Sequence, residues 1–204
     1  MIEFFFLFWF LLDKKLKIYE KQKLNYNMIK IFHSISSSAL SYYAIQTNDY
    51  HLENNILYSF SKTYFLWDSF KITTENIYTI HGLFHHIGSL YAMNMLYYNT
   101  FNEIILKCYY ATEMSNIPLF ISYHMINTNS QYKNIIKKIQ ILFYLYFRMY
   151  MMSIYLYESI YLENRLLLSS GIIIYLLGIK TLYDLIIKKH LNITFLKSII
   201  SKKC

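Results

Sequence analysis

The chain has 204 residues, of which 55% are hydrophobic and 20% aromatic, with only four glycines and one proline. A water-soluble fold of this size could not hide so much apolar surface. The formal net charge is +8, but the lysines gather beside apolar runs, as juxtamembrane segments do beside anionic headgroups. We therefore expect a lipid bilayer and its membrane lipids as partners, and no nucleic acid. Cys108 and Cys204 are too few for a disulfide framework or a cysteine metal site.

The first apolar run, residues 2–12, is shorter than the roughly 20 residues that a helix needs to cross a bilayer. No basic region precedes it and no small-residue cleavage site follows it, which argues against a signal peptide. We expect a short apolar helix, either a truncated first span or an interfacial anchor. A cationic amphipathic stretch from Asp13 to Lys23 follows and should lie against headgroups. Together they form the first predicted region, residues 1–27.

Six longer apolar runs follow, each close to the length that a helix needs to cross a bilayer. They cover residues 28–45, 56–72, 77–98, 103–126, 139–161 and 166–187. The predicted fold is all-α: a polytopic transmembrane helical bundle with six full spans plus a short N-terminal apolar helix. The transmembrane domain covers residues 28–190, and a basic C-terminal tail covers residues 191–204.

The lysines indicate an orientation for these spans. Loop 127–138 carries three lysines, whereas loop 46–55 carries two acidic residues and no lysine. Six crossings return the basic tail to the side of the lysine-rich N-terminal segment, and loop 127–138 falls on that side too. The positive-inside rule then places the N- and C-terminal basic segments in the cytoplasm.

Ionisable side chains lie inside these predicted spans, where each costs about 2.5–3.5 kcal/mol on insertion scales. Such a side chain needs a partner, an aqueous cavity or a function. The residues concerned are Lys62, Asp68, His81, His85, His86, Glu103, Lys107, Glu113, His124, Arg148 and Glu158.

Three histidines gather in the third full span. The i, i+4 spacing places His81 and His85 on one helix face, with Ser89 nearby, whereas His86 points about 100° away from His85. At least one of the adjacent histidines must therefore face the bundle interior, where a neutral imidazole could act as a general base. Hydrogen bonding to neighbouring helices is the alternative. For three histidines in six residues we favour a function.

The same trio resembles one histidine box of membrane di-iron oxygenases. Those sites need several such boxes, whereas the other histidines of this chain are scattered singly. We therefore expect neither a metal nor a resident cofactor.

The fourth full span combines Glu113, Ser115 and Asn116 with the only proline of the chain. Pro118 cannot donate to the carbonyl of Met114, which predicts a kink and a free backbone acceptor. A kink beside these side chains would make a polar pocket wall. A structural kink capped by its own side chains is an equally good interpretation.

Asp68 and Arg148 are candidates for ion pairs with each other or with Glu113, because an unpaired buried charge is costly. For both residues we favour an ion-pair role over catalysis.

The order of these motifs resembles the TLC domain, which is shared by translocation-associated membrane proteins, ceramide synthases and smaller TLC-domain-containing proteins. The resemblance covers about residues 28–187 and depends on the order and spacing of motifs on five successive spans. The residues on which the resemblance depends are His33, residues 64–68, the His85–His86 pair, Glu113-Met-Ser115-Asn116-Ile-Pro118 and Arg148. The resemblance implies a helical bundle around a cavity open to lipid, with the histidine pair on its wall, in the endoplasmic reticulum or a connected membrane.

Ceramide synthases join an acyl chain from acyl-CoA to a sphingoid amine. Their pattern has a His-Asp-x-x-Asp stretch just before the Leu-Glu that corresponds to Thr112-Glu113. At those positions this chain has Ile105, Leu106 and Tyr109. Because the second acid-base set is missing, the chain looks more like the small TLC-domain proteins, whose implied role lies in membrane lipid composition.

We therefore expect a multi-pass membrane protein that binds a lipid or acyl chain in its bundle and influences lipid or sphingolipid homeostasis. A homodimer is compatible with the sequence. The alternative is a ceramide-synthase-like N-acyltransferase with acyl-CoA as co-substrate, in which His85 or His86 is base or transient acyl acceptor and Glu113 orients it. The candidates for cavity or ion-pair roles are Asp68, His81, Ser115, Asn116 and Arg148.

Two further classes stay open. The charges at membrane depth suggest a transporter or channel, but the chain has no internal repeat and no paired broken helices, which many secondary transporters have. A purely structural assembly protein would tolerate replacement of the histidines.

Overall fold

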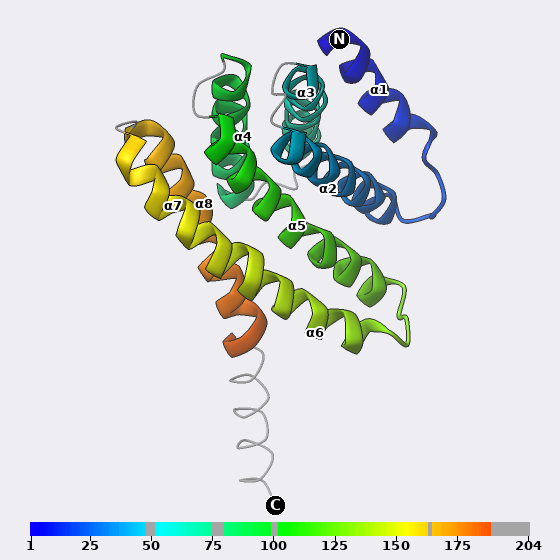
Figure 1. The fold of residues 1–204 in the computed structure, drawn as a ribbon. Coiled ribbons are helices and arrows are strands. Elements are labelled where there is room, and N and C mark those ends of the chain that lie inside the picture. The colour runs from blue at the N-terminus through cyan, green and yellow to red at the C-terminus, as the bar shows by residue number, and fades with distance from the viewer. Residues whose placement is uncertain (48–51, 75–79, 99–101, 163–164, 189–204) are drawn as a thin grey trace, which may run out of the picture.

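The structure, a computed structural model, describes residues 1–47, 52–74, 80–98, 102–162 and 165–188, and within these ranges every regular element is a helix (Figure 1). The elements in chain order are α1 (Ile2–Lys15), α2 (Gln22–Thr47), α3 (Leu52–Thr74), α4 (Ile80–Tyr97), α5 (Asn102–Asn127), α6 (Lys133–Phe143), η1 (Tyr144–Met151), α7 (Met152–Ser159), η2 (Ile160–Leu162), α8 (Arg165–Tyr183) and η3 (Asp184–Lys188). The all-α prediction is confirmed, and each predicted span corresponds to one helix or one continuous run of helix.

The elements α6, η1, α7 and η2 follow one another without interruption and form one long rod. Its middle part, η1, is π-helical and holds Tyr144 and Arg148 in the interior. Single-turn π segments are rare and frequently mark functional sites. On the neighbouring α5, the helix continues through Pro118 to Asn127.

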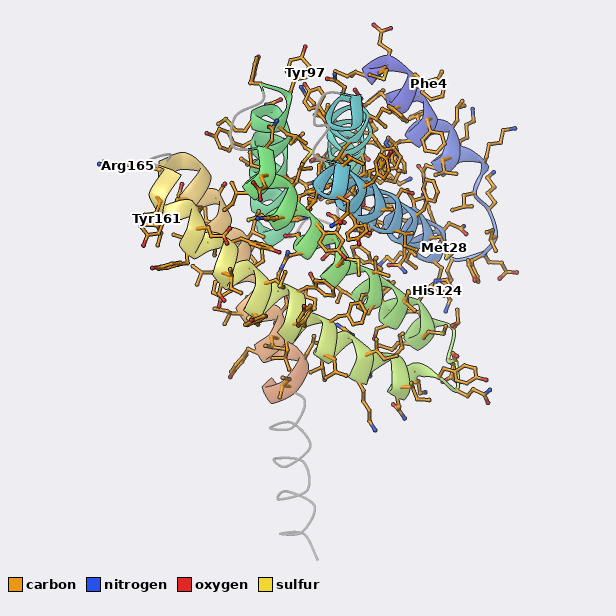
Figure 2. The ribbon with its side chains drawn as sticks, in the orientation of Figure 1. Phe4, Met28, Tyr97, His124, Tyr161 and Arg165 are labelled. Atoms are coloured by element: carbon orange, nitrogen blue, oxygen red, sulfur yellow. The ribbon has the colours of Figure 1, made fainter. Side chains whose placement is uncertain are left out.

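The helices form an antiparallel bundle whose two ends differ in charge. Met28 and His124 lie near one another at one end, whereas Tyr97, Tyr161 and Arg165 lie toward the other (Figure 2). The α1–α2 connection, the end of α3 and the α5–α6 connection lie at the first end. A contact between two of these segments is found there, because His124 Nε2 lies 2.9 Å from the Tyr19 hydroxyl. We call it the lysine-rich end, after Lys14, Lys15, Lys17, Lys21, Lys23, Lys71, Lys133, Lys137 and Lys138.

The interior of the bundle combines a hydrophobic core with many buried polar side chains, and large apolar side chains also cover much of the exterior. On α2 the buried face carries four serines, Ser34, Ser37, Ser38 and Ser41, whereas the exposed face carries Phe32, Ile35, Tyr42 and Tyr43. Exposed aromatic and aliphatic side chains recur on the other helices. Such an exterior is suited to lipid, because the backbone groups are already paired within the helices.

Two stretches among the described residues are long and apolar enough to cross a membrane by length and composition, Lys133–Ile160 and Leu168–Ile186. The helices are confirmed, whereas six full spans stay a prediction. Serine, asparagine and histidine lower the mean hydropathy of the other helices whichever way their side chains point. The buried serines of α2 are the clearest case.

The short apolar helix α1 is part of the bundle and packs against α3. Trp9 is fully buried, its indole N–H donates to the Phe60 carbonyl at 3.1 Å, and its ring lies 5.2 Å from that of Tyr64. The cationic stretch after it is divided: α1 ends at Lys15 and α2 begins at Gln22.

Candidate functional site

A cavity of about 370 Å³ lies between α2, α3, α4, α5, η1 and α8. Its lining residues lie at the middle of each helix or in the half nearer the lysine-rich end. They are Lys30, His33, Ser34, Tyr64, Phe65, Asp68, Ile72, His85, His86, Glu113, Asn116, Leu119, Phe120, Tyr144, Arg148, Leu177 and Thr181. We call this the polar cavity.

The polar cavity brings together six of the eight site residues predicted from the sequence. These six are Asp68, His85, His86, Glu113, Asn116 and Arg148. Ser115 lies outside the lining: it is fully buried on α5 and its hydroxyl donates to the Thr112 carbonyl at 2.7 Å. The side chain of His81 lies outside the described residues.

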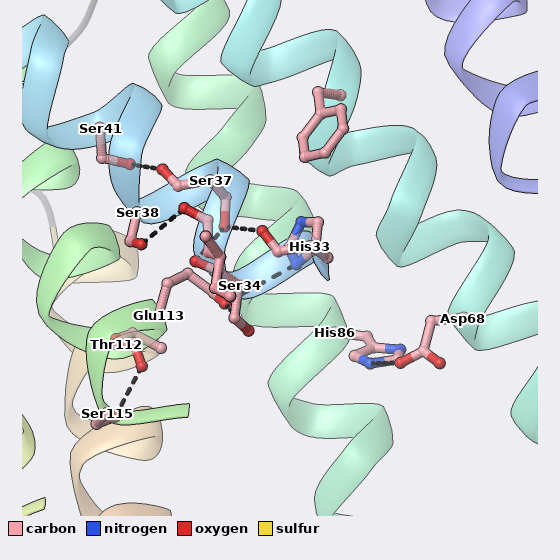
Figure 3. Close-up of polar contacts among 12 residues, drawn as sticks. His33, Ser34, Ser37, Ser38, Ser41, Asp68, His86, Thr112, Glu113 and Ser115 are labelled. Carbon is pink, nitrogen blue, oxygen red and sulfur yellow. Dashed lines mark hydrogen bonds and ion pairs between the residues drawn. The ribbon is translucent and has the colours of Figure 1, made fainter. Parts of the chain in front are cut away.

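One polar network joins α2, α3 and α4 at the cavity wall. His86 Nε2 lies 2.9 Å from Asp68 Oδ2 (Figure 3), and the Tyr26 hydroxyl donates to the other carboxylate oxygen. Ser69 Oγ lies 2.8 Å from His86 Nδ1 and donates its single proton to the Phe65 carbonyl at 2.7 Å. Both ring nitrogens of His86 are engaged.

His85 is held in a different way. Its ring packs edge-on against Phe65 with the centroids 6.0 Å apart, and it forms no hydrogen bond with any residue that the structure describes. Arg148 and Lys30 are close enough to act on it electrostatically. Of the two adjacent histidines, His85 is the one with ring nitrogens available to a ligand.

Glu113 belongs to a second network, on the α2 side of the cavity. Its Oε2 accepts a hydrogen bond from Ser34 at 2.7 Å and lies 3.8 Å from His33 Nδ1 (Figure 3). His33 in turn stacks on Tyr64 with the ring centroids 3.6 Å apart. The predicted role of Glu113, orienting the histidine pair, does not match this geometry, because α5 turns this carboxylate toward α2. Asp68, on the helix packed against α4, occupies that position instead.

Arg148 is 5% exposed and lines the polar cavity from the centre of η1. Its Nε and Nη1 have no hydrogen-bond partner among the described residues, and no described carboxylate forms an ion pair with it. The ion pair predicted with Asp68 or Glu113 is not formed, because Asp68 is engaged by His86 and Glu113 faces α2.

Sequence reasoning missed three lining or network residues at the start of α2. Tyr26, Lys30 and Ser34 follow one another at i, i+4 spacing, which places them on one helix face. Tyr26 lies between the cationic stretch 13–23 and the predicted span 28–45, and Lys30 and Ser34 lie inside that span, where their common face is the signal that could have found them. His33 entered only through the family resemblance.

A smaller, apolar pocket of about 50 Å³ lies one helical turn beyond the polar cavity, toward the other end of the bundle. Ser89 follows His85 by one turn, and Met152 follows Arg148 in the same way. The residues that line this smaller pocket are Ser89, Ala92, Ile104, Ile105, Cys108, Tyr109, Thr112, Met152, Ser159, Ser170, Gly171 and Ile174. We call it the apolar pocket. Among the residues described, no group of three or more His, Cys, Asp or Glu side chains is placed to hold a metal ion.

The sequence profile of the TLC domain matches residues 23–197, which include all of the polar cavity. The chain belongs to the TLC domain family. A search among curated proteins finds no significant match. Membership of the TLC domain family, together with the apolar helices, indicates a membrane protein linked to lipid metabolism or lipid sensing.

A double-mutant cycle tests the pair on the wall of the polar cavity. We expect Asp68→Asn and His86→Gln to be coupled by about 1–3 kcal/mol in the free energy of unfolding, because the two side chains share one buried network. Chemical unfolding in detergent micelles measures this quantity. The control is the same cycle on Glu103 and Lys107, which lie 2.6 Å apart but are more exposed and should couple by no more than about 0.5 kcal/mol. Equal coupling in the two cycles would contradict the buried pairing.

Proposed function

We propose that this TLC-domain protein binds one lipid or acyl chain inside its helical bundle and takes part in membrane lipid homeostasis, including that of sphingolipids. The observation that carries the proposal is the polar cavity of about 370 Å³, enclosed by helices with apolar outer faces. A polar headgroup would find hydrogen-bonding partners there, and the apolar pocket one turn away would receive the first part of a hydrocarbon chain.

We also propose that α2, α3, α4, α5, the rod from α6 to η2, and α8 all cross the bilayer, in the endoplasmic reticulum or a connected membrane. The shortest, α4, has 18 residues, a length of about 27 Å, close to the roughly 30 Å of hydrocarbon. Inward-facing polar groups do not oppose insertion when they find partners inside the bundle. The positive-inside rule favours a cytoplasmic lysine-rich end.

Cysteine labelling tests this topology. In a Cys108→Ser, Cys204→Ser background, Lys17→Cys and Gln131→Cys should react with a membrane-impermeant maleimide added to the cytoplasmic side of sealed microsomes. Tyr98 is exposed directly after the C-terminal end of α4, away from the lysine-rich end. Tyr98→Cys should therefore react only after permeabilisation. Labelling of all three positions from one side would contradict the crossing pattern.

Filling the polar cavity tests lipid binding. Thr181→Phe places an aromatic ring in the cavity lining. A bound lipid would then be overpacked at a cost of about 1–3 kcal/mol, so the amount of lipid that co-purifies with the protein should fall about tenfold. Mass spectrometry of the purified protein measures that amount. Thr73→Phe is the matched control, because Thr73 is exposed on α3. Undiminished lipid in Thr181→Phe would count against the cavity as the binding site.

The free ring of His85 favours a second candidate function, N-acyl transfer of the ceramide-synthase type with acyl-CoA as co-substrate. In one version His85 would attack the thioester, release the CoA thiol as the C–S bond breaks, and pass the acyl group to the amine; in the other it would take the proton from the amine as the amine displaces the CoA thiol. The Asp68–His86 pair would position the adjacent backbone. Against this function stand Ile105, Leu106 and Tyr109, where ceramide synthases carry their second acid-base set.

Expression in cells that lack ceramide synthases tests the second candidate. If the chain is an acyltransferase, the parent protein should restore ceramide, and His85→Ala should lower it by about 100-fold or more. His124→Ala, outside the polar cavity, is the matched control and should behave as the parent. A parent that reaches the membrane without restoring ceramide excludes sphingoid N-acylation and leaves the lipid-binding proposal in place.

A further inference from the structure

We propose that the polar cavity recognises an oxyanion, the phosphate or carboxylate head of an anionic lipid, through Arg148 with Lys30 as a second cation. This inference depends on the proposed function, lipid binding in the cavity, and specifies the class of headgroup.

Arg148 forms no ion pair with any carboxylate that the structure describes. Its side chain is 5% exposed, and both Nε and Nη1 have no hydrogen-bond partner there. An isolated guanidinium in a low-dielectric interior is costly, and arginine stays charged because it does not release its proton in proteins. An oxyanion in the cavity would supply the missing partner.

The choice of arginine at this position fits an oxyanion. Arg148 and Arg165 are the only arginines, whereas the chain has 18 lysines. A lysine presents a point charge, but the planar guanidinium fork pairs with two oxygens of a phosphate or carboxylate at once. Arg165 is exposed at the opposite end of the bundle. The buried arginine is therefore unusual for this chain.

The backbone around Arg148 is shaped to hold it. The residue lies at the centre of the π-helical η1, and Gly178 of α8 packs directly against its side chain. A Cβ at position 178 would lie 2.6 Å from Arg148 Cγ and 3.1 Å from Nε. Any larger residue at position 178 would displace the guanidinium from the cavity wall.

Lys30 adds a second cation to the same lining. Its Nζ lies 4.3 Å from the centroid of the Tyr26 ring, and no described carboxylate pairs with it. Lys30, Arg148 and His85 all line the polar cavity. Glu113 is the acid that acts on Arg148, but its carboxylate is turned toward α2 and engaged by Ser34.

The apolar pocket indicates that the oxyanion is the head of an amphiphile rather than a free ion. It shares α4, α5 and α8 with the polar cavity, lies one turn beyond it and is lined by Ile104, Ile105 and Ile174. A lipid with its head at Arg148 would direct its chain toward this pocket.

Native mass spectrometry of the purified full-length protein in a neutral detergent tests the inference. The probes are dioleoyl phosphatidate, oleate, dioleoylglycerol and inorganic phosphate. We expect phosphatidate to bind at least about tenfold more tightly than dioleoylglycerol, which has the same chains without the anion. Arg148→Met should weaken phosphatidate binding about 10- to 100-fold, Arg148→Lys should lose less, and Arg165→Met should behave as the parent. Glu113→Gln should tighten binding, because it removes the nearby negative charge.

Competition by inorganic phosphate identifies the source of the anion. Displacement of phosphatidate at equal concentration supports a site for free phosphate, whereas displacement only at large excess supports a lipid headgroup. Thermal unfolding checks that the Arg148→Met variant is folded. In the absence of anionic lipid, its melting temperature should equal or exceed that of the parent, because the substitution removes a buried unpaired charge. The stabilisation that phosphatidate gives the parent should then be absent.

Two results would overturn the oxyanion site. One is equal binding of phosphatidate and dioleoylglycerol by the parent, and the other is an Arg148→Met variant that keeps the preference for phosphatidate. Both leave lipid binding in the cavity intact, so they are distinguishable from failure of the proposed function. A parent that binds neither lipid would overturn both proposals.

Discussion

Polar groups enclosed by a bundle with an apolar exterior must find their partners inside the protein, since lipid offers none. The serine row of α2 meets this constraint locally: Ser37 donates to the His33 carbonyl at 2.7 Å and Ser41 to the Ser37 carbonyl at 2.6 Å. The carboxylates meet it between helices, Asp68 with His86 and Glu113 with Ser34. The same contacts hold α2, α3, α4 and α5 around the polar cavity.

Buried polar atoms without a hydrogen-bond partner indicate where a ligand could bind. Among the residues described, Arg148 has two unpaired nitrogens and His33 has one, at Nε2, and both residues line the polar cavity. A buried unsatisfied donor costs about 1–3 kcal/mol, so a fold that keeps several of them in one place gains from a ligand there. The π-helical η1 and Gly178 maintain this arrangement around Arg148.

The two adjacent histidines illustrate how one helix serves two purposes. Because they point about 100° apart, α4 directs His86 to α3, where Asp68 and Ser69 engage both ring nitrogens, while His85 stays available in the cavity. The paired histidine fixes the rotation of α4 and so the position of its neighbour. Binding and group transfer would both use this arrangement.

The helices, the all-α class and most of the candidate residues could be predicted from the amino-acid sequence, because helix length, apolar periodicity and the position of charged residues within apolar runs are local properties of the chain. The sequence also indicated a lysine-rich end. The predicted span starts at residue 28, whereas α2 begins at Gln22, so Tyr26 was left outside it. By length and hydropathy, two of the described helical stretches are apolar enough to cross a membrane, because inward-facing polar residues lower the mean hydropathy as much as outward-facing ones.

Which acidic side chain pairs with which partner depends on how the helices pack against one another. Asp68 pairs with His86 rather than with Arg148, and Glu113 reaches Ser34, 79 residues away in sequence. Such pairings depend on which helices pack side by side and on how far each is rotated about its axis. No local pattern encodes either quantity, so the unpaired state of Arg148 could be found only once the helices were placed.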